Sequence, residues 1–328
     1  MDAVALGLLL YVVALLTMGG IYAVLALGLN VQWGFTGLFN AGIAGFFAIG
    51  AYTSAILTTI PADHSDRLFG AELPLPLAWL LAMLMSGLIA IGIGKICLRL
   101  RSDYLAIGTI GIAEILRLFF KNEAAVSNGA RGIPQLPKPF EDLAQPWEQL
   151  AFLALVIAIV AVLYIALERA LHSPWGRMMK AIRENERAAA AMGKNIERRR
   201  LEAFVLGAMI MGLGGALMAH SFKFIGPEAT EPLMTTFLVW VMLIAGGSGN
   251  NKGAIIGAVG IWAIWSLTEI MTSGLPPEWA VRASYLRIFL IGLVLQVVLQ
   301  RFPGGLFPER STVASQTTPP KPNTVPAE

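Results

Sequence analysis

Cysteine and histidine are scarce in this chain of 328 residues. Its one cysteine, Cys97, excludes an internal disulfide and any metal site built from several cysteines. The three histidines, His64, His172 and His220, lack the spacing of metal ligands. No Walker-type GxxxxGK[ST] motif occurs, so we expect that the chain does not hydrolyse ATP itself. No nucleophile–base constellation is found either. We therefore predict a protein that is not an enzyme and binds no metal or cofactor.

Charged residues are also few, at 14% of the chain, whereas hydrophobic residues make up 56%. A soluble domain carries about 25% charged residues, so the composition indicates an integral membrane protein. The net charge of +3 is no sign of nucleic-acid binding, because the basic residues cluster in loops between apolar runs. No basic segment precedes the first apolar run, and we expect this run to be the first membrane span rather than a cleaved signal peptide.

The apolar runs predict an all-α, polytopic membrane protein with about nine transmembrane helices. A helical span needs roughly 20 residues, and the uncharged residues 3–62 allow two spans. The other seven are predicted at 77–98, 104–120, 150–167, 201–222, 233–245, 254–272 and 284–300. A count of eight or ten stays open. Residues 1–310 then form one transmembrane domain, and the Ser-, Thr- and Pro-rich residues 311–328 form a disordered tail.

The run 3–62 is expected to break near residues 34–37, close to Asn30, Gln32 and Asn40. Glycine and polar side chains inside an apolar run are typical of a discontinuous helix that lines a cavity, because lipid cannot satisfy free backbone groups. A short turn between two ordinary helices is the alternative, and both stay open. The small residues within 42–51, and the glycine pairs elsewhere in the apolar runs, favour close helix packing.

Glu114 and Arg117 are charges well inside a predicted span, and at a spacing of three they share a helix face. A carboxylate within a span indicates function by default, so Glu114 joins Asn40 and Gly42 as a candidate for the translocation path. The preferred interpretation is a structural pair in which Arg117 reaches toward the membrane interface. A proton-coupled carrier ordinarily needs several intramembrane carboxylates, and Glu269 is the other candidate.

Residues 173–200, SPWGRMMKAIRENERAAAAMGKNIERRR, form the longest strongly charged segment. The pattern predicts a helix, a glycine hinge and a second helix that enters the membrane. Their signals are Ser173 and Pro174 at the start, helix over 175–192, a left-handed cap at Gly193 and a helix cap at Asn195. The apolar residues 188–192 would be exposed in an idle loop, and an exposed apolar patch rimmed by charge favours a docking surface. A solvated loop that only fixes the topology is the alternative.

The distribution of Lys and Arg predicts the orientation, because these residues are retained on the cytoplasmic side. Nine of the 24 lie within residues 169–200. If this segment is cytoplasmic, the turn at 95–103, the turn at Lys252 and the C-terminus are cytoplasmic too. Sixteen of the 24 basic residues then lie inside and the N-terminus lies outside.

The stretch AIRENERAAAAMGKNIERRRLEAFVLGAMIMGLGGAL resembles the cytoplasmic loop and following span of bacterial ABC importer permeases for branched-chain amino acids. The resemblance extends to FNAGIAGFFAIGAYTSAIL, SDYLAIGTIGIAEILRL, GGSGNNKGAIIGA and RFPGGLFPE, and so covers about residues 20–310. The segments SDYLAI and RGIPQLP look more like the M-type subunit, the LivM family, than its H-type partner. The resemblance implies an ABC importer permease fold in the bacterial inner membrane.

The resemblance also implies partners and sites. A second, H-type permease completes a heterodimer, two cytosolic ATPase subunits bind ATP and Mg²⁺, a periplasmic binding protein delivers substrate, and lipid surrounds the spans. The loop 173–200 docks onto an ATPase subunit through a turn that contains Glu184, Glu186, Arg187, Ala190, Gly193 and Asn195. In the outer loop, 122–149, the family's TGGPNGI-like stretch appears as SNGARGI, which makes Asn128, Gly129, Arg131 and Gly132 contact candidates. A urea or short-amide permease of the same family and an ATPase-independent secondary carrier are the alternatives.

Overall fold

A computed structural model describes residues 3–61, 66–100, 102–273 and 276–309. The described chain is almost entirely helical. Its one small sheet pairs β1 (Ile133–Pro134) with β2 (Phe224–Ile225) in antiparallel register. The predicted all-α class is therefore confirmed. The predicted tail, 311–328, lies outside the described residues.

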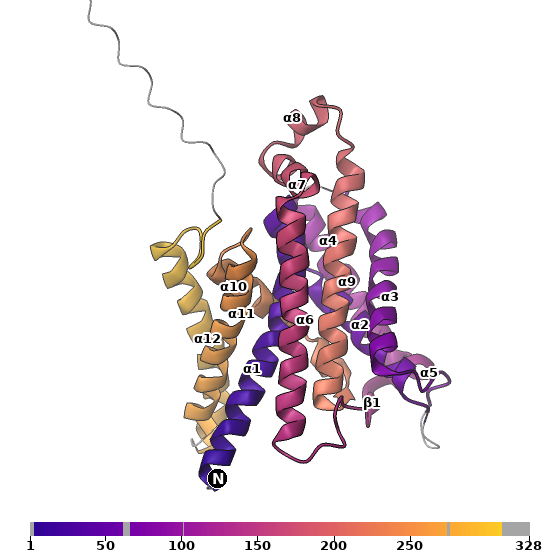
Figure 1. Ribbon diagram of the computed structural model, residues 1–328, viewed down its shortest axis with the longest axis vertical. Helices are drawn as coiled ribbons and strands as arrows, with labels where there is room; N and C mark the ends of the chain where they lie inside the picture. The colour runs from indigo at the N-terminus through magenta and orange to yellow at the C-terminus, as the bar shows by residue number, and fades with distance from the viewer. Residues whose placement is uncertain (1–2, 62–65, 101, 274–275, 310–328) are drawn as a thin grey trace, which may run out of the picture.

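Each of the nine predicted spans overlaps one α-helix of the described chain, although the span 233–245 begins in a π-helix, and the long helices run side by side (Figure 1). They are α1 (Ala3–Leu29), α2 (Ile43–Thr58), α3 (Leu75–Cys97), α4 (Ser102–Asn122), α6 (Trp147–His172), α9 (Ile196–Phe222), α10 (Leu238–Gly246), α11 (Asn251–Ser273) and α12 (Pro277–Arg301). The short helical elements are η1 (Asn30–Gly34), α5 (Ala124–Ser127), η2 (Gly129–Arg131), α7 (Pro174–Glu184), α8 (Glu186–Ala191), η3 (Pro227–Thr230) and η4 (Leu233–Phe237).

Five helices of the described chain are long and apolar enough to cross a membrane: α1 with η1, α3, α6, α9 and α11. The apolar helices α2 and α10 are shorter. The count of nine spans therefore stays a prediction, whereas the polytopic helical architecture is confirmed.

Helix α9 is the centre of the bundle. It is mostly buried, whereas the other four long apolar helices expose most of their apolar stretch. Helix α2 lies against it at glycine contacts: a Cβ added to Gly50 would lie 2.0 Å from the Gly212 carbonyl oxygen, and one added to Gly215 would lie 2.1 Å from the Phe47 carbonyl oxygen. The small residues therefore let the helix backbones touch, as the sequence predicted.

The connections gather at the two ends of the bundle. Residues 173–200, which we call the elbow, lie at the end opposite the N-terminus (Figure 1). The α10–α11 turn lies there too, and the backbone N–H groups of Leu306 and Phe307 donate to the Ala245 and Gly246 carbonyl oxygens, both at 2.9 Å. Arg99 at the α3–α4 turn shares a cavity with the elbow. The described parts of the four segments predicted to share one side of the membrane thus lie at one end of the bundle, with residues 306–307 standing for the C-terminal segment.

Candidate functional site

The elbow contains one helix break that the sequence did not predict. Ser173 starts α7 as expected, and its Oγ accepts the Gly176 N–H at 3.4 Å. The continuous helix predicted over 175–192 is wrong, because Asn185 is extended at φ −153° and separates α7 from α8. The Asn185 Oδ1 accepts the Ala188 N–H at 3.0 Å. Asparagine competes with the helix interior through such bonds, so the elbow has two short helices instead of one.

The predicted hinge after α8 is confirmed. Gly193 has φ +74°, in the left-handed region where glycine is favoured. The Asn195 Oδ1 then accepts the Arg198 N–H at 3.0 Å and caps α9. Each turn of the elbow is thus fixed by a glycine or by a side chain that accepts a nearby backbone N–H.

The predicted docking residues form an exposed surface. Glu184, Glu186, Arg187, Ala190, Gly193 and Asn195 are all exposed. The apolar end of α8 is exposed as well: Met192 is 78% exposed, whereas Ala189 faces inward. The surface is available to a partner, and docking itself stays a prediction.

Arg183 connects the elbow to the membrane helices. Its Nη1 donates to the Gly34 carbonyl oxygen at the end of η1. Its Nη2 lies 2.6 Å from the Glu309 Oε2, and the Lys180 Nζ lies 2.8 Å from the Glu309 Oε1. We call these four groups the clamp. All three side chains of the clamp are no more than 26% exposed, so the charge contacts are partly shielded from water.

The Gly34 carbonyl oxygen of the clamp lies in the segment where the regular helix α1 has ended. Residues 30–34 form a π-turn, and residues 37–42 are not helical. The break predicted near 34–37 is therefore confirmed. Thr36 and Gly37 line a cavity of about 430 Å³ at the elbow end of the bundle, and both a discontinuous helix that lines a path at membrane depth and a short turn stay predictions. π-Turns within helices often mark functional positions.

We call this irregular segment, residues 30–42, the break. A buried polar network holds its first half. Asn30 is fully buried, its Nδ2 donates to the Asn251 Oδ1 at 2.9 Å, and its Oδ1 accepts the Gly249 N–H at 2.8 Å. The Asn251 Nδ2 in turn donates to the Glu168 Oε2 at 2.9 Å. Buried polar groups are costly unless paired, so these bonds fix α1 against α6 and the α10–α11 turn.

The second half of the break is paired in the same way. The Asn40 Nδ2 donates to the Gln32 Oε1 at 2.7 Å, and the Gln32 Nε2 donates to the Phe204 carbonyl oxygen of α9 at 2.7 Å. The Trp240 Nε1 donates to the Asn40 carbonyl oxygen at 3.1 Å, and the Asn40 Oδ1 accepts the Gly42 N–H at 2.8 Å. Irregular backbone at membrane depth needs such partners.

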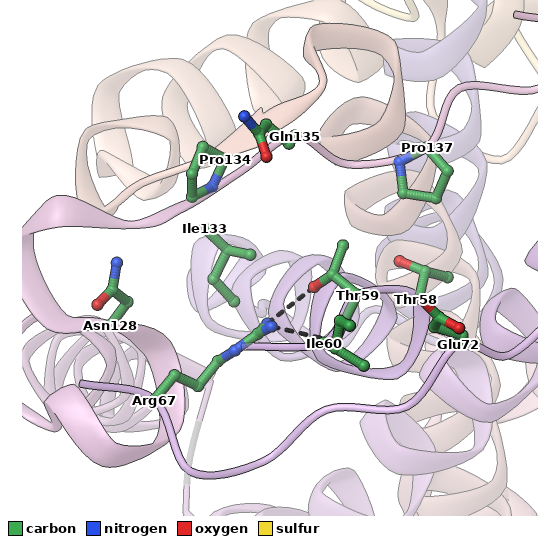
Figure 2. A pocket seen from close by; sticks show the side chains of 10 residues that line it. All are labelled: Thr58, Thr59, Ile60, Arg67, Glu72, Asn128, Ile133, Pro134, Gln135 and Pro137. Atoms are coloured by element: carbon green, nitrogen blue, oxygen red, sulfur yellow. Dashed lines mark hydrogen bonds between the residues drawn. The ribbon is translucent and has the colours of Figure 1, made fainter. Parts of the chain in front are cut away.

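A second pocket lies at the end of the bundle opposite the elbow. It is formed by the end of α2, the loop before α3 and β1 (Figure 2). Its volume is about 430 Å³. Arg67, only 5% exposed, reaches into it, and its Nη1 and Nη2 donate to the Thr59 Oγ1 (2.9 Å) and carbonyl oxygen (3.0 Å). Burial lowers the pKa of the Arg67 guanidinium. The pocket also has a carboxylate, Glu72, and an aliphatic wall that includes Ile133.

The outer-loop candidates lie beside this pocket. Asn128 lines it, and its Nδ2 donates to the Gly132 carbonyl oxygen at 2.8 Å. Gly132 has φ +69°, and a Cβ there would lie 2.3 Å from the Ile225 carbonyl oxygen, so both the turn and β2 require glycine. Gly129 also has a positive φ of 60°. Arg131 is exposed, with its Nη1 3.9 Å from the Asp66 Oδ2. Their role as a contact for a binding protein stays a prediction.

Two of the three candidates for a translocation path, Asn40 and Gly42, are joined by the hydrogen bond described above, whereas no described hydrogen bond joins Glu114 to either of them. Asn40 is fully buried, and Gly42 packs against Thr109. Glu114 lies on α4 and pairs with Arg117, whose Nη2 and Nε lie 2.5 Å and 2.8 Å from its two carboxylate oxygens. The preferred Glu114–Arg117 pair is therefore confirmed. Neither of the two cavities above is lined by Asn40, Gly42 or Glu114, and their role in transport stays a prediction.

Comparison with known proteins gives a family match over residues 11–299, to the model described as "Branched-chain amino acid transport system / permease component". The chain is 35% identical over 270 residues to the high-affinity branched-chain amino acid transport system permease protein LivM of Escherichia coli K12. This match covers 75% of the chain and 60% of the E. coli protein. The chain thus spans less than two thirds of that relative's length.

Two further relatives are matched over most of their length. The chain is 26% identical to the probable branched-chain amino acid transport permease protein LivM of Methanocaldococcus jannaschii, over 92% of this chain and 93% of that protein. It is 25% identical to the LivH permease protein of E. coli K12, over 85% of this chain and 91% of that protein. No solved structure matches the chain.

Proposed function

Because this chain belongs to the family of permease components of branched-chain amino acid transport systems, we propose that it is the M-type permease subunit of an ATP-driven importer for branched-chain amino acids. The family match over residues 11–299 carries this proposal. The apolar helices agree with a multi-pass protein of the inner membrane. In this proposal the elbow faces the cytoplasm and the N-terminus faces the outside, as the distribution of basic residues predicts.

The proposed importer has four further subunits around this chain. Likeness to proteins named LivM and to proteins named LivH supports a pair of different permeases. Two cytosolic ATPase subunits bind ATP and Mg²⁺, and a periplasmic binding protein delivers the amino acid. This chain would bind neither ATP nor Mg²⁺.

The contacts of the elbow suggest how ATP binding elsewhere moves this chain. An ATPase subunit would hold the exposed surface of α8 and the residues around Gly193. Movement of α7 reaches the Gly34 carbonyl oxygen through Arg183. The break is bonded to α9 and to the α10–α11 turn, and through Asn251 to α6. The clamp would thus turn a movement of the elbow into a tilt of the helices around the break, which is the kind of rocking that alternating access needs.

Reconstitution of the purified system into proteoliposomes tests the proposal. Uptake of labelled leucine is expected to need internal ATP, both permeases, the ATPase subunits and the binding protein. Uptake by the permeases alone would instead establish a secondary carrier. A binding protein that takes urea and not leucine would establish the rival substrate class.

Gly193→Val is expected to lower leucine uptake and substrate-stimulated ATPase activity several-fold while the complex still assembles. No atom lies within 4 Å of the added Cβ, so the effect comes from the backbone. The left-handed conformation costs an L-residue about 1–2 kcal/mol, and β-branching adds to it. The matched control is Gly193→Asn, because asparagine tolerates this conformation. Equal activity of the valine and asparagine variants would contradict a coupling role of this hinge.

Glu114→Gln is expected to lower the thermal stability of the complex slightly without changing its ligand preference. The variant removes the negative charge of the pair, but the amide oxygen can still accept a hydrogen bond from Arg117, which can also reach toward the membrane interface. Competition between leucine, isoleucine and valine for uptake measures the preference, and a melting curve measures stability. Selective loss of one substrate at normal expression would place Glu114 in the translocation path.

A further inference from the structure

The cavity where the elbow meets the bundle has a strongly basic wall. Arg99 and Leu100 line it from the end of α3, Arg183 and Glu186 from α7 and α8, and Arg200 from the start of α9. We call this cavity the basic pocket. Its volume, about 430 Å³, lies in the range of small-molecule sites.

Positive charge exceeds negative charge around the basic pocket. The Arg200 Nη1 lies 3.2 Å from the Glu186 Oε1, and Arg183 is held by the clamp. Among the described contacts, Arg99 has no ion pair. Among the described residues, three arginines and one carboxylate, Glu186, line the pocket, and the clamp adds Lys180 and Glu309 beside it. The pocket therefore attracts an anion with about two negative charges or fewer.

Leu100, which lines the basic pocket, belongs to an exposed apolar stretch of the chain. Leu100 is 40% exposed, and its neighbours Ile96 and Tyr104 are 73% and 64% exposed. These side chains continue the exposed aliphatic faces of α3 and α4, which include Leu88 at 64% and Ile107 at 67%. In a multi-pass membrane protein such faces meet acyl chains, so the pocket opens at the level where lipid headgroups begin.

We propose that the basic pocket binds the headgroup phosphate of an anionic phospholipid, with the acyl chains along the ends of α3 and α4. Guanidinium groups match phosphate oxygens in bidentate geometry, and basic pockets between membrane helices recognise anionic headgroups. A carboxylate of a partner protein would use the arginines but not the exposed apolar stretch. The bound headgroup bridges α3 to α7 and α9, and so steadies the elbow against the bundle.

Lipid retention by the complete transporter tests this proposal. The complex is purified from nanodiscs of phosphatidylcholine with a minor share of phosphatidylglycerol, and bound lipid is measured by native mass spectrometry. Each arginine near an anionic headgroup contributes a factor of about five. Arg99→Gln and Arg200→Gln are each expected to lower retention of phosphatidylglycerol about fivefold, and the double variant about thirtyfold. The control Lys194→Gln removes an exposed cation of the elbow and should retain the lipid.

A photo-crosslinker at position 99, in an otherwise unchanged chain, tests the same contact if the double variant does not assemble. Adducts with phosphatidylglycerol are expected. Adducts confined to another subunit would overturn the proposal in favour of a protein carboxylate. Release of the wild-type lipid by inorganic phosphate would overturn it in favour of a free-anion site, and unchanged retention in the double variant would overturn it outright.

Discussion

Arg183→Gln is expected to lower ATP-driven leucine uptake about tenfold while ATPase activity continues without its dependence on the loaded binding protein. The substitution removes the ion pair with Glu309 and weakens the bond to the Gly34 carbonyl oxygen. Loss of one partner from a shielded charge pair leaves the other charge unpaired and costs several kcal/mol at full burial. Here the partners are 22–26% exposed, so we expect the loss of the pair to cost about 1–2 kcal/mol. A cost of this size shifts the equilibrium between two conformational states about tenfold.

Arg187→Gln is the matched control for Arg183→Gln. Arg187 lies on the same elbow, is exposed, and has no ion pair among the described contacts. If charge on the elbow matters only for docking, Arg187→Gln should be the more harmful of the two. If the clamp transmits movement, Arg183→Gln should uncouple the complex although assembly, measured by size-exclusion chromatography, is unchanged. Coupled transport at the wild-type rate in Arg183→Gln would rule out the clamp as the link.

The difference between the elbow and the clamp shows what the sequence could predict. Ser173, Gly193 and Asn195 act on backbone groups within three residues, so their signals are local and were read correctly. Asn185 was missed because it is flanked by glutamate and arginine, good helix formers that give no stop signal. The clamp joins Arg183 to groups 126 and 149 residues away. No spacing rule reaches that far, although Glu309 is the last residue of RFPGGLFPE, a stretch that resembles the permease family.

The break after α1 combines a position that local sequence signals predict with partners that they do not. Its place was predicted, because glycine and amide side chains in an apolar run require an explanation. Its partners were not: Asn30 bonds Asn251 across 221 residues, and Gln32 bonds Phe204 across 172. Polar residues in an uncharged run thus predict that the backbone is irregular, and only the fold identifies which helices satisfy it.

Gly50→Ala is expected to abolish assembly of the permease, against what helix propensity predicts. Alanine stabilises a helix interior by about 1 kcal/mol relative to glycine, so propensity alone favours the variant. The added Cβ, however, would lie 2.0 Å from the carbonyl oxygen of Gly212 and 2.4 Å from its carbonyl carbon and Cα. All three contacts are with backbone atoms, which no side-chain rotation relieves, so α2 and α9 must separate. Overpacking of this kind costs about 1–3 kcal/mol or more.

Gly92→Ala separates the two effects, because the same change at this position in α3 has no atom within 4 Å of the new Cβ. Propensity should act there alone, with unchanged or slightly higher stability. Fluorescence-detected size-exclusion chromatography of tagged variants measures the yield of monodisperse complex. Since α9 is the buried centre of the bundle, loss of its contact with α2 should remove the assembled peak and not merely lower the melting temperature. A wild-type peak from Gly50→Ala would mean that the α2–α9 crossing is looser than these distances require, and that the small residues of α2 are not what sets the helix spacing.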